Sequence, residues 1–327
     1  MVDRSPSPLI TPLLLNINQD FKKNITSGFE TLQILGCGSF GVVRKVMEKS
    51  TQQLYAMKTI IFNPENEEAM QNGLKEIGIL SRCNHPNIIK FHGFEVNENE
   101  INFLMDLMEC NLEVFMKEKA DLVTIKFIIE TFFSILDALN YLHQKYNIMH
   151  RDIKPSNILV NRNNEIRLSD FGTVKGRSTG TITEKIVGSK YFLAPELFIA
   201  MKTNLSFEAT VNFSKCDVFS FGLTLLRMIT NEDFVKNDVV LNYNEADLEN
   251  YLLKNKMKIP LEIYDTLLLM LRFNVDLRPD IATLYKLLIP RKECILNEIN
   301  KVSFYKNIEI ARFFTFRIHF LKAIRSK

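Results

Sequence analysis

Short hydrophobic runs, many of them rich in β-branched and aromatic residues, dominate the first third of the chain and predict β-strands. Polar or turn-forming residues separate these runs, which marks them as individual elements. The predicted strands cover residues 29–35, 42–46, 54–61, 91–94 and 101–105.

One segment between the third and fourth predicted strands has helical spacing instead. Asn63 can cap this helix and Pro64 suits its first position. Gly73 and Gly78 lie inside it and cost about 1 kcal/mol each relative to alanine. We therefore predict a marginal helix that moves between an active and an inactive position. Its hydrophobic stripe consists of Met70, Leu74, Ile77 and Leu80 or Ile79.

The spacing becomes helical after the strand region. Residues 123–146 carry hydrophobic side chains with a period near 3.6, which predicts a long helix. Early strands and later helices predict an α+β chain with a β-rich first part and a larger α-helical second part. The stripe of the long helix comprises Ile125, Ile128, Ile129, Phe132, Phe133, Leu136, Leu139 and Leu142.

Composition narrows the class of protein. The 41 Lys and Arg residues nearly balance 38 Asp and Glu residues, and the net charge of +3 does not indicate a nucleic-acid binder. Five scattered cysteines without a metal-ligand spacing argue against disulfides and zinc, and favour a reducing compartment. The sequence contains no apolar run of about eighteen residues, so we expect no membrane span. Without a targeting signal, we expect a location in the cytosol, with the nucleus as a further location.

A glycine-rich segment joins the first two predicted strands. Gly36 to Gly41 reads GCGSFG and has strand-like sequence on both sides, whereas a dinucleotide-binding loop would open a helix. Glycines let backbone N–H groups approach phosphates, because no Cβ intervenes. The local pattern fits a phosphate-binding hairpin and a plain hairpin turn equally well.

A polar loop follows the long predicted helix. His150 to Asn157 reads HRDIKPSN and precedes the β-like residues 158–160, so a rigid scaffold can hold its reactive groups. The tripeptide DFG begins at Asp170, after another predicted strand at 165–169, and APE begins at Ala194.

This order of motifs resembles the eukaryotic protein kinases, over about residues 29–292. The resemblance implies a bilobal fold, with a β-rich N-lobe at 27–108 that has one regulatory helix, and a larger α-helical C-lobe at 109–292. Turn-forming Ser-Pro and Thr-Pro pairs predict a disordered N-terminal extension at 1–26. A basic amphipathic extension follows at 293–327, and it either touches a membrane or partner or packs on the large lobe.

The resemblance also implies ATP and Mg²⁺ as cofactors. Asp152 would orient the substrate hydroxyl, and Lys154 would neutralise the transferred phosphoryl group. Lys58 would contact the α- and β-phosphates and pair with Glu76. The implied Mg²⁺ ligands are Asn157 and Asp170.

The other implied nucleotide contacts come from the glycine-rich segment and from the hinge between the lobes. Met105 would be the gatekeeper, and the backbone of Asp106 and Met108 would bind the adenine edge. Val43, Ala56 and Leu159 would enclose the ring. The full implied set is Leu35, Gly36, Cys37, Gly38, Ser39, Phe40, Gly41, Val43, Ala56, Lys58, Met105, Asp106, Met108 and Leu159.

In the C-lobe, the resemblance implies a buried pair between Glu196 and Arg278, and an anchoring role for Asp217 beneath the catalytic loop. Ser189 would bond near Asp152 and Lys154. Arg151 reads as an unpaired cation awaiting a phosphate on the activation segment. The candidate phosphoacceptors are Thr181 and Thr183, followed by Ser178 and Thr179.

Residues 141–172 look like the MAP kinase kinases, which share IMHRD and KPSNILVN, and the hinge sequence MDLMECNLEVF is similar as well. The resemblance implies a dual-specificity enzyme whose protein substrate is a MAP kinase, with an upstream activating kinase as a second partner. Glu184 and Lys185 depart from the usual activation pattern of the group. The alternatives are another Ser/Thr kinase and a catalytically inactive nucleotide-binding scaffold.

Overall fold

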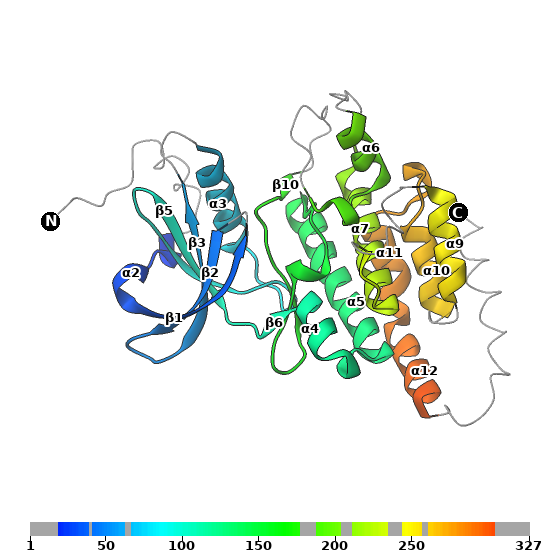
Figure 1. The fold of residues 1–327 in the computed structure, drawn as a ribbon, viewed down its shortest axis with the longest axis horizontal. Coiled ribbons are helices and arrows are strands. Elements are labelled where there is room, and N and C mark those ends of the chain that lie inside the picture. The colour runs from blue at the N-terminus through cyan, green and yellow to red at the C-terminus, as the bar shows by residue number, and fades with distance from the viewer. Residues whose placement is uncertain are drawn as a thin grey trace.

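The computed structural model describes residues 19–38, 41–62, 67–176, 188–203, 211–234, 244–256 and 261–304. Two lobes lie side by side, a smaller one built around a sheet and a larger helical one (Figure 1). The predicted bilobal α+β architecture is confirmed.

The smaller lobe contains a five-stranded antiparallel sheet with the order β1-β2-β3-β5-β4. Each predicted strand is present, and the polar residues 97–99 form the turn between the last two. The strands are β1 (Phe29–Gly38), β2 (Gly41–Glu48), β3 (Leu54–Ile61), β4 (Phe91–Val96) and β5 (Glu100–Asp106).

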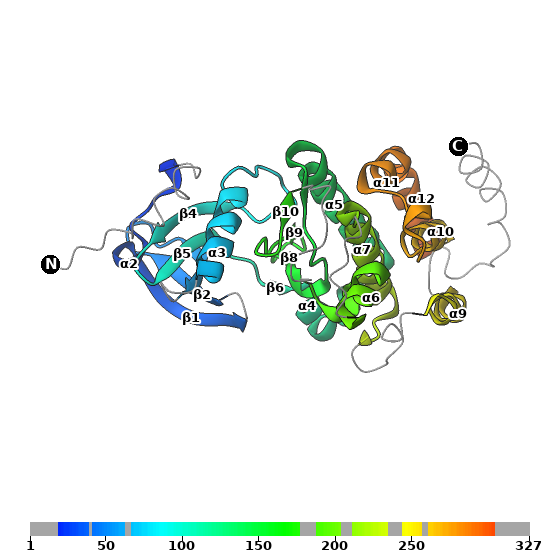
Figure 2. The ribbon, with the colours of Figure 1, turned by 90° about the horizontal axis from the view of Figure 1, so that it is seen from above.

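Helix α3 (Glu67–Leu80) packs on one face of this sheet, as the view from above shows (Figure 2). Its predicted stripe is buried at Met70, Leu74, Ile77 and Leu80. A Cβ at Gly73 would lie 3.0 Å from side chains of Ile60 and Ile101. The glycine that weakens the helix therefore also allows it to approach the sheet closely. The predicted cap and first position, Asn63 and Pro64, lie outside the described residues.

The prediction of a disordered extension over residues 1–26 is wrong for residues 19–26. The turn η1 (Gln19–Phe21) and the short helix α2 (Ile25–Gly28) pack against β4, and Ile25 is buried among hydrophobic residues of the sheet. Residues 1–18 lie outside the described part of the chain.

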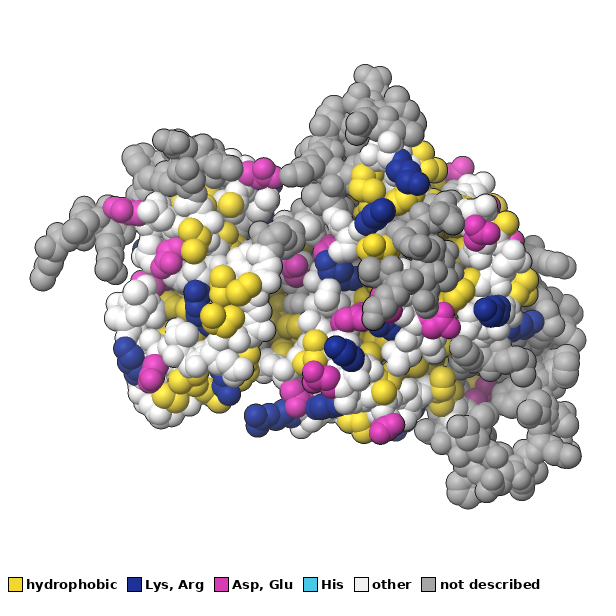
Figure 3. Space-filling model, in the orientation of Figure 1, with side chains coloured by type: hydrophobic (Ala, Val, Ile, Leu, Met, Phe, Trp, Pro, Cys, Tyr) yellow, Lys and Arg dark blue, Asp and Glu magenta, His cyan; other side chains and the backbone are white. Residues whose placement is uncertain are grey.

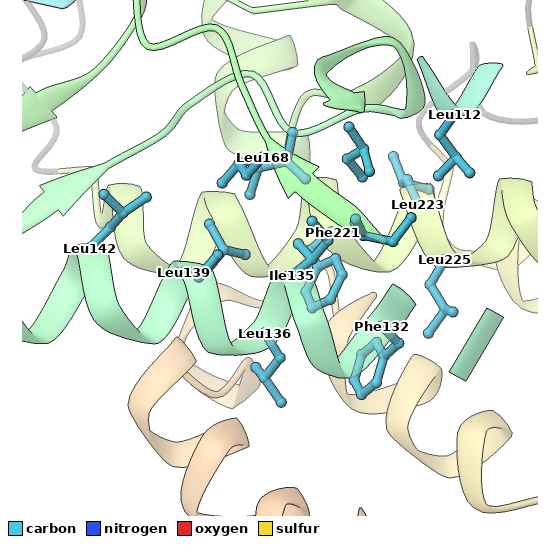
Figure 4. Close-up of a cluster of buried hydrophobic side chains, with 14 of the residues drawn as sticks. Leu112, Phe132, Ile135, Leu136, Leu139, Leu142, Leu168, Phe221, Leu223 and Leu225 are labelled. Carbon is cyan, nitrogen blue, oxygen red and sulfur yellow. The ribbon is translucent and has the colours of Figure 1, made fainter. Parts of the chain in front are cut away.

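Two long helices form the centre of the larger lobe. The predicted long helix is α5 (Ile125–Tyr141), which Thr124 caps, and α7 (Phe213–Thr230) packs against it. Figure 4 shows side chains of both helices meeting below the segment that carries Leu168. Phe132 stacks on Phe221 there, with ring centroids 5.0 Å apart. The other helices are α4 (Leu112–Glu118), α6 (Pro195–Thr203), α9 (Glu245–Asn255), α10 (Leu261–Met270), α11 (Ile281–Leu288) and α12 (Lys292–Phe304).

The C-lobe continues past the predicted boundary at residue 292. Helix α12 packs on α5, and Ile295 is buried. Residues 305–327, which hold most of the basic amphipathic pattern, lie outside the described residues. None of the helices in the described ranges is long and apolar enough to cross a membrane.

Short strands carry the loops that face the smaller lobe. A three-stranded sheet contains β6 (Cys110–Asn111), β8 (Ile158–Val160) and β9 (Ile166–Leu168). A second pair joins β7 (Ile148–Met149) to β10 (Lys175–Gly176). The polar loop 150–157 therefore leaves one short strand and enters another, which holds both of its ends.

Candidate active site

The glycine-rich segment is a hairpin, which confirms the prediction that it does not open a helix. Gly38 lies opposite Gly41 at the end of the β1–β2 ladder. Gly41 has a φ of 121°, and a Cβ there would collide with the carbonyl oxygen of Thr59 on β3. The hairpin therefore requires glycine at this position. Ser39 and Phe40, at its tip, lie outside the described residues.

Three charged side chains meet where the two lobes face each other. Lys58 Nζ on β3 lies 2.8 Å from Glu76 Oε2 on α3 and 3.4 Å from Asp170 Oδ1. The predicted Lys58–Glu76 pair is thus confirmed. Burial alone would lower the pKa of Lys58, but the two carboxylates outweigh it and raise that pKa. Lys58 therefore remains a cation although it is buried. The space-filling view shows hydrophobic side chains where the two lobes face each other (Figure 3).

The hinge places the predicted adenine-binding residues near one another. Ala56 pairs with Met105 across β3 and β5, and both are buried, as is Met108. The N–H of Asp106 donates to Lys90 O over 3.0 Å. A backbone contact from Asp106 to adenine would therefore come from its carbonyl group. Leu159 lies on β8, half-buried beneath the hinge.

The side chain of Asp106 makes a contact that sequence reasoning missed. Its carboxylate binds the guanidinium of Arg167 on β9, and its second oxygen lies 2.5 Å from His92 Nε2 on β4. This cluster joins the two lobes on the hinge side. The sequence carries no local signal for it, because the three residues lie on three separate strands.

Asp152 is buried in the catalytic loop and has several partners. Its Oδ2 lies 2.7 Å from Lys154 Nζ and accepts from Asn157 Nδ2 over 2.9 Å, while Oδ1 accepts from the N–H of Ser189. Burial disfavours the ionised form, but the Lys154 ammonium and the hydrogen bonds outweigh it and hold the pKa of Asp152 below its usual value. The loop therefore presents an ionised carboxylate at neutral pH.

Lys154 bridges the catalytic loop and the segment that follows Gly188. Its Nζ donates to Ser189 Oγ over 2.5 Å, as predicted. Gly188 has a φ of 120°, and a Cβ there would lie 2.8 Å from Arg151 O. The chain can approach the loop this closely because residue 188 is glycine.

Asp217 anchors the catalytic loop from below, as predicted. It lies on α7, is fully buried, and accepts hydrogen bonds of 2.8 Å from the backbone N–H groups of His150 and Arg151. Its Oδ2 also lies 2.9 Å from His143 Nε2. Arg151 has a φ of 67°, an uncommon value outside glycine, and these bonds stabilise it.

The interpretation of Arg151 as an unpaired cation is wrong. Its Nε donates to Thr173 O over 2.6 Å, and its guanidinium lies 5.5 Å from the ring centroid of Phe213. Both partners follow Arg151 in sequence by more than twenty residues, so no local pattern indicates them. The candidate phosphoacceptors at 178–183 lie outside the described residues.

The donor set near the loop fits a metal ion that also binds phosphate oxygens. Asn157 Nδ2 donates to the backbone oxygen and the carboxylate of Asp152, and among the described residues no hydrogen bond engages its Oδ1. Ser169 donates from N and from Oγ to Asn157 O, which holds Asp170 beside it. Within the described ranges, no group of three or more His, Cys, Asp and Glu residues could hold a metal by itself. One carboxylate and one amide oxygen suit Mg²⁺ that retains waters and phosphate ligands.

Two further ion pairs shape the C-lobe around the loop. The predicted pair between Glu196 and Arg278 is confirmed, with Nη1 and Oε1 2.8 Å apart. Arg227, buried on α7, binds Glu113 of α4 over 2.6 Å, a contact that the sequence did not indicate. This pair fixes α4, which follows the hinge, against the central helix.

Comparison with known proteins agrees with this geometry. Residues 29–287 match the protein kinase domain family. The chain is also 32% identical, over 216 residues, to the dual specificity mitogen-activated protein kinase kinase mek-2 of Caenorhabditis elegans. The match covers 66% of this chain and 53% of that relative, so the chain spans about half of the relative's length.

Proposed function

We propose that this chain, which belongs to the protein kinase family, is a MAP kinase kinase that transfers the γ-phosphoryl group of ATP to Ser or Thr and Tyr residues of a MAP kinase. The observation that carries the proposal is the cluster of Asp152, Lys154 and Ser189 beside the Lys58–Glu76–Asp170 group. The likeness to a MAP kinase kinase supports the choice of substrate.

The chemistry follows from the charges at the site. Lys58 is a buried cation held by two carboxylates, so it is suited to bind nucleotide phosphates. Asp152 is ionised and can accept or orient the proton of a substrate hydroxyl, an effect typically worth about 10²–10⁴-fold. Lys154 lies beside it and can offset the negative charge of the transferred group. Asn157 and Asp170 would hold Mg²⁺, which bridges phosphate oxygens and offsets their charge when it is bound.

The test is to incubate the chain with Mg²⁺-ATP and a panel of MAP kinases, and to map the phosphorylated residues by mass spectrometry. We expect phosphate on a Thr and a Tyr of the activation loop of at least one MAP kinase. Asp152→Asn is the control, and it should remove the product. Phosphate on Ser or Thr alone would refute dual specificity and leave the alternative of another Ser/Thr kinase.

A nucleotide-binding scaffold without catalysis is the second candidate. The contacts of Lys58 with Asp170 and of Asn157 with Asp152 argue against it, because a scaffold that only binds nucleotide would not need these groups together. Equal ATP consumption by the wild type and by Asp152→Asn, with nucleotide binding intact in both, would favour the scaffold.

A further inference from the structure

One carboxylate oxygen holds the N-terminal segment, residues 19–28, on the sheet. Glu95 Oε2 on β4 accepts hydrogen bonds from Ile25 N over 3.1 Å, from Thr26 N over 2.7 Å and from Thr26 Oγ1 over 2.6 Å. The charge of this acceptor strengthens each bond. Two of the three donors belong to Thr26, so this residue is central to the attachment.

The other contacts of the N-terminal segment lie along the open edge of the sheet. Lys22 forms a parallel bridge with Phe94, and Lys23 N donates to Phe94 O over 2.9 Å. Phe21 meets Phe91 edge to face, with centroids 5.1 Å apart. The segment therefore covers the free edge of β4, the last strand in the sheet order (Figure 2).

Gly93 shows how closely the N-terminal segment approaches β4. A Cβ there would lie 2.7 Å from the side chain of Lys23 and 2.9 Å from Phe21 O. Ile25 is 2% exposed and packs with Val46 and Leu104 in a small hydrophobic cluster. Thr26 itself is exposed, so the same residue that fastens the segment is open to an enzyme.

We propose that Thr26 is a phosphorylation site whose modification releases residues 19–28 from β4. Lys22 and Lys23 precede it by four and three residues, which suits a Ser/Thr kinase that recognises basic residues before its acceptor. In the reaction, Thr26 Oγ1 loses its proton and bonds to the γ-phosphorus of ATP, and ADP leaves. The inference concerns the back of the smaller lobe and does not depend on the proposed function.

Phosphorylation would release residues 19–28 because it replaces the Thr26 hydroxyl, a hydrogen-bond donor, with an anion. The hydroxyl now donates to Glu95, whereas a phosphoryl group carries about −1.5 to −2 charges at neutral pH and would chiefly accept hydrogen bonds. The phosphoryl group would face the Glu95 carboxylate, which now accepts all three hydrogen bonds. Lys49 Nζ already donates to Ser27 O over 2.8 Å, so this ammonium has a partner on the backbone of α2.

The test uses the full chain and amide hydrogen exchange. The amides of Lys23, Ile25 and Thr26 are hydrogen-bonded and should exchange slowly. After incubation with ATP and a kinase that prefers basic residues before its acceptor, mass spectrometry should find phosphate on Thr26. Exchange across residues 19–28 should then accelerate on the order of tenfold or more, the factor that the loss of a charge-assisted bond predicts.

Three variants distinguish the effect of a negative charge at residue 26 from the effect of losing the hydrogen bond between Thr26 and Glu95. Thr26→Glu should accelerate exchange. Thr26→Glu combined with Glu95→Gln should exchange more slowly than Thr26→Glu alone, because the repulsion between the two carboxylates is gone. Ser27→Glu is the matched control, since Ser27 is exposed and bonds to Asn24 rather than to Glu95. It should leave exchange within about twofold of the wild type, which is the scale of a surface substitution.

Gly93→Ala is the positive control for release without any change of charge, because the new methyl group would collide with the backbone oxygen of Phe21 as well as with the Lys23 side chain. It should accelerate exchange across residues 19–28 as phosphorylation does. The proposal is overturned if Thr26 stays unmodified while other residues of the chain accept phosphate. Slow exchange in the chain phosphorylated at Thr26, beside fast exchange in Gly93→Ala, would overturn it as well.

Discussion

Arg278 uses every N–H group of its guanidinium, which makes its removal a sharp test of the C-lobe. Nη1 donates to Glu196 Oε1 and to Lys215 O, and Nη2 donates to Glu196 Oε2 and to Phe273 O. Nε donates to Arg272 O over 2.9 Å. The cation also lies 4.9 Å from the ring centroid of Phe219.

Arg278 and Glu196 are unequally buried, and their burial sets how much free energy of unfolding is lost when the pair is broken. The Arg278 side chain is 0% exposed, whereas that of Glu196 is 22% exposed. Glu196→Gln would leave the cation buried with a neutral acceptor, and Arg278→Met would leave three backbone carbonyls and the carboxylate without their donor. Breaking a buried pair in this way typically costs about 3–5 kcal/mol. We expect each variant to lower the free energy of unfolding of the C-lobe by about that amount.

The assay is urea denaturation followed by circular dichroism, which suits a chain without tryptophan. The double variant should be less destabilised than the sum of the two single variants, because both remove the same interaction. Arg162→Met, which changes an exposed arginine, is the matched control and should stay within about 0.5 kcal/mol of the wild type. If Glu196→Gln and Arg278→Met also stay within that margin, the pair does not stabilise the lobe and the reasoning fails.

Four further predictions concern the catalytic loop. Asp152→Asn should lower kcat by about 10²–10⁴-fold and leave nucleotide affinity unchanged, which kinetics and calorimetric titration would check. Lys154→Met should raise the pKa of Asp152 and move the acid limb of kcat to higher pH; an unmoved limb would contradict the ion pair. Because the folded-state pKa of Asp152 is depressed, its stabilisation is present above the unfolded-state pKa and is lost as pH falls through the folded value. The urea midpoint of the wild type should therefore fall more on acidification than that of Asp152→Asn. Asp217→Asn would leave the N–H of His150 or Arg151 without an acceptor, at about 1–3 kcal/mol, and hydrogen exchange at those two amides would show it.

The elements with strong hydrophobic periodicity could be predicted from the sequence. The stripe of α3 and that of α5 are buried as their spacing indicates, except that Ile125 is only half-buried. The pairs Lys58–Glu76 and Glu196–Arg278 could also be predicted. Each member lies in a kinase motif, and the resemblance to the family implies which other motif supplies its partner. The hydrophobic stripes are signalled by neighbouring positions, whereas the two pairs follow from the resemblance to the protein kinases.

Several other contacts could not be predicted from the sequence. Glu95 binds Thr26 across 69 positions, so the packing of the N-terminal segment has no local signature. The partners of Arg151 and the binding of Asp106 to Arg167 likewise depend on which strands and loops the fold brings together. Such contacts follow from tertiary packing, and a pattern of hydrophobic and polar positions does not encode them.

The anchoring of the catalytic loop by Asp217 also constrains the order of events during synthesis. Asp217 follows His150 by 67 positions, so the loop leaves the ribosome well before its anchor does. At about 5–20 residues per second, the delay amounts to roughly 3–13 s. During that interval the smaller lobe and α5 are already available to fold, while the loop lacks the carboxylate that orders its backbone. A nascent chain that stops before α7 would therefore present a nucleotide-facing sheet without an ordered centre for phosphoryl transfer.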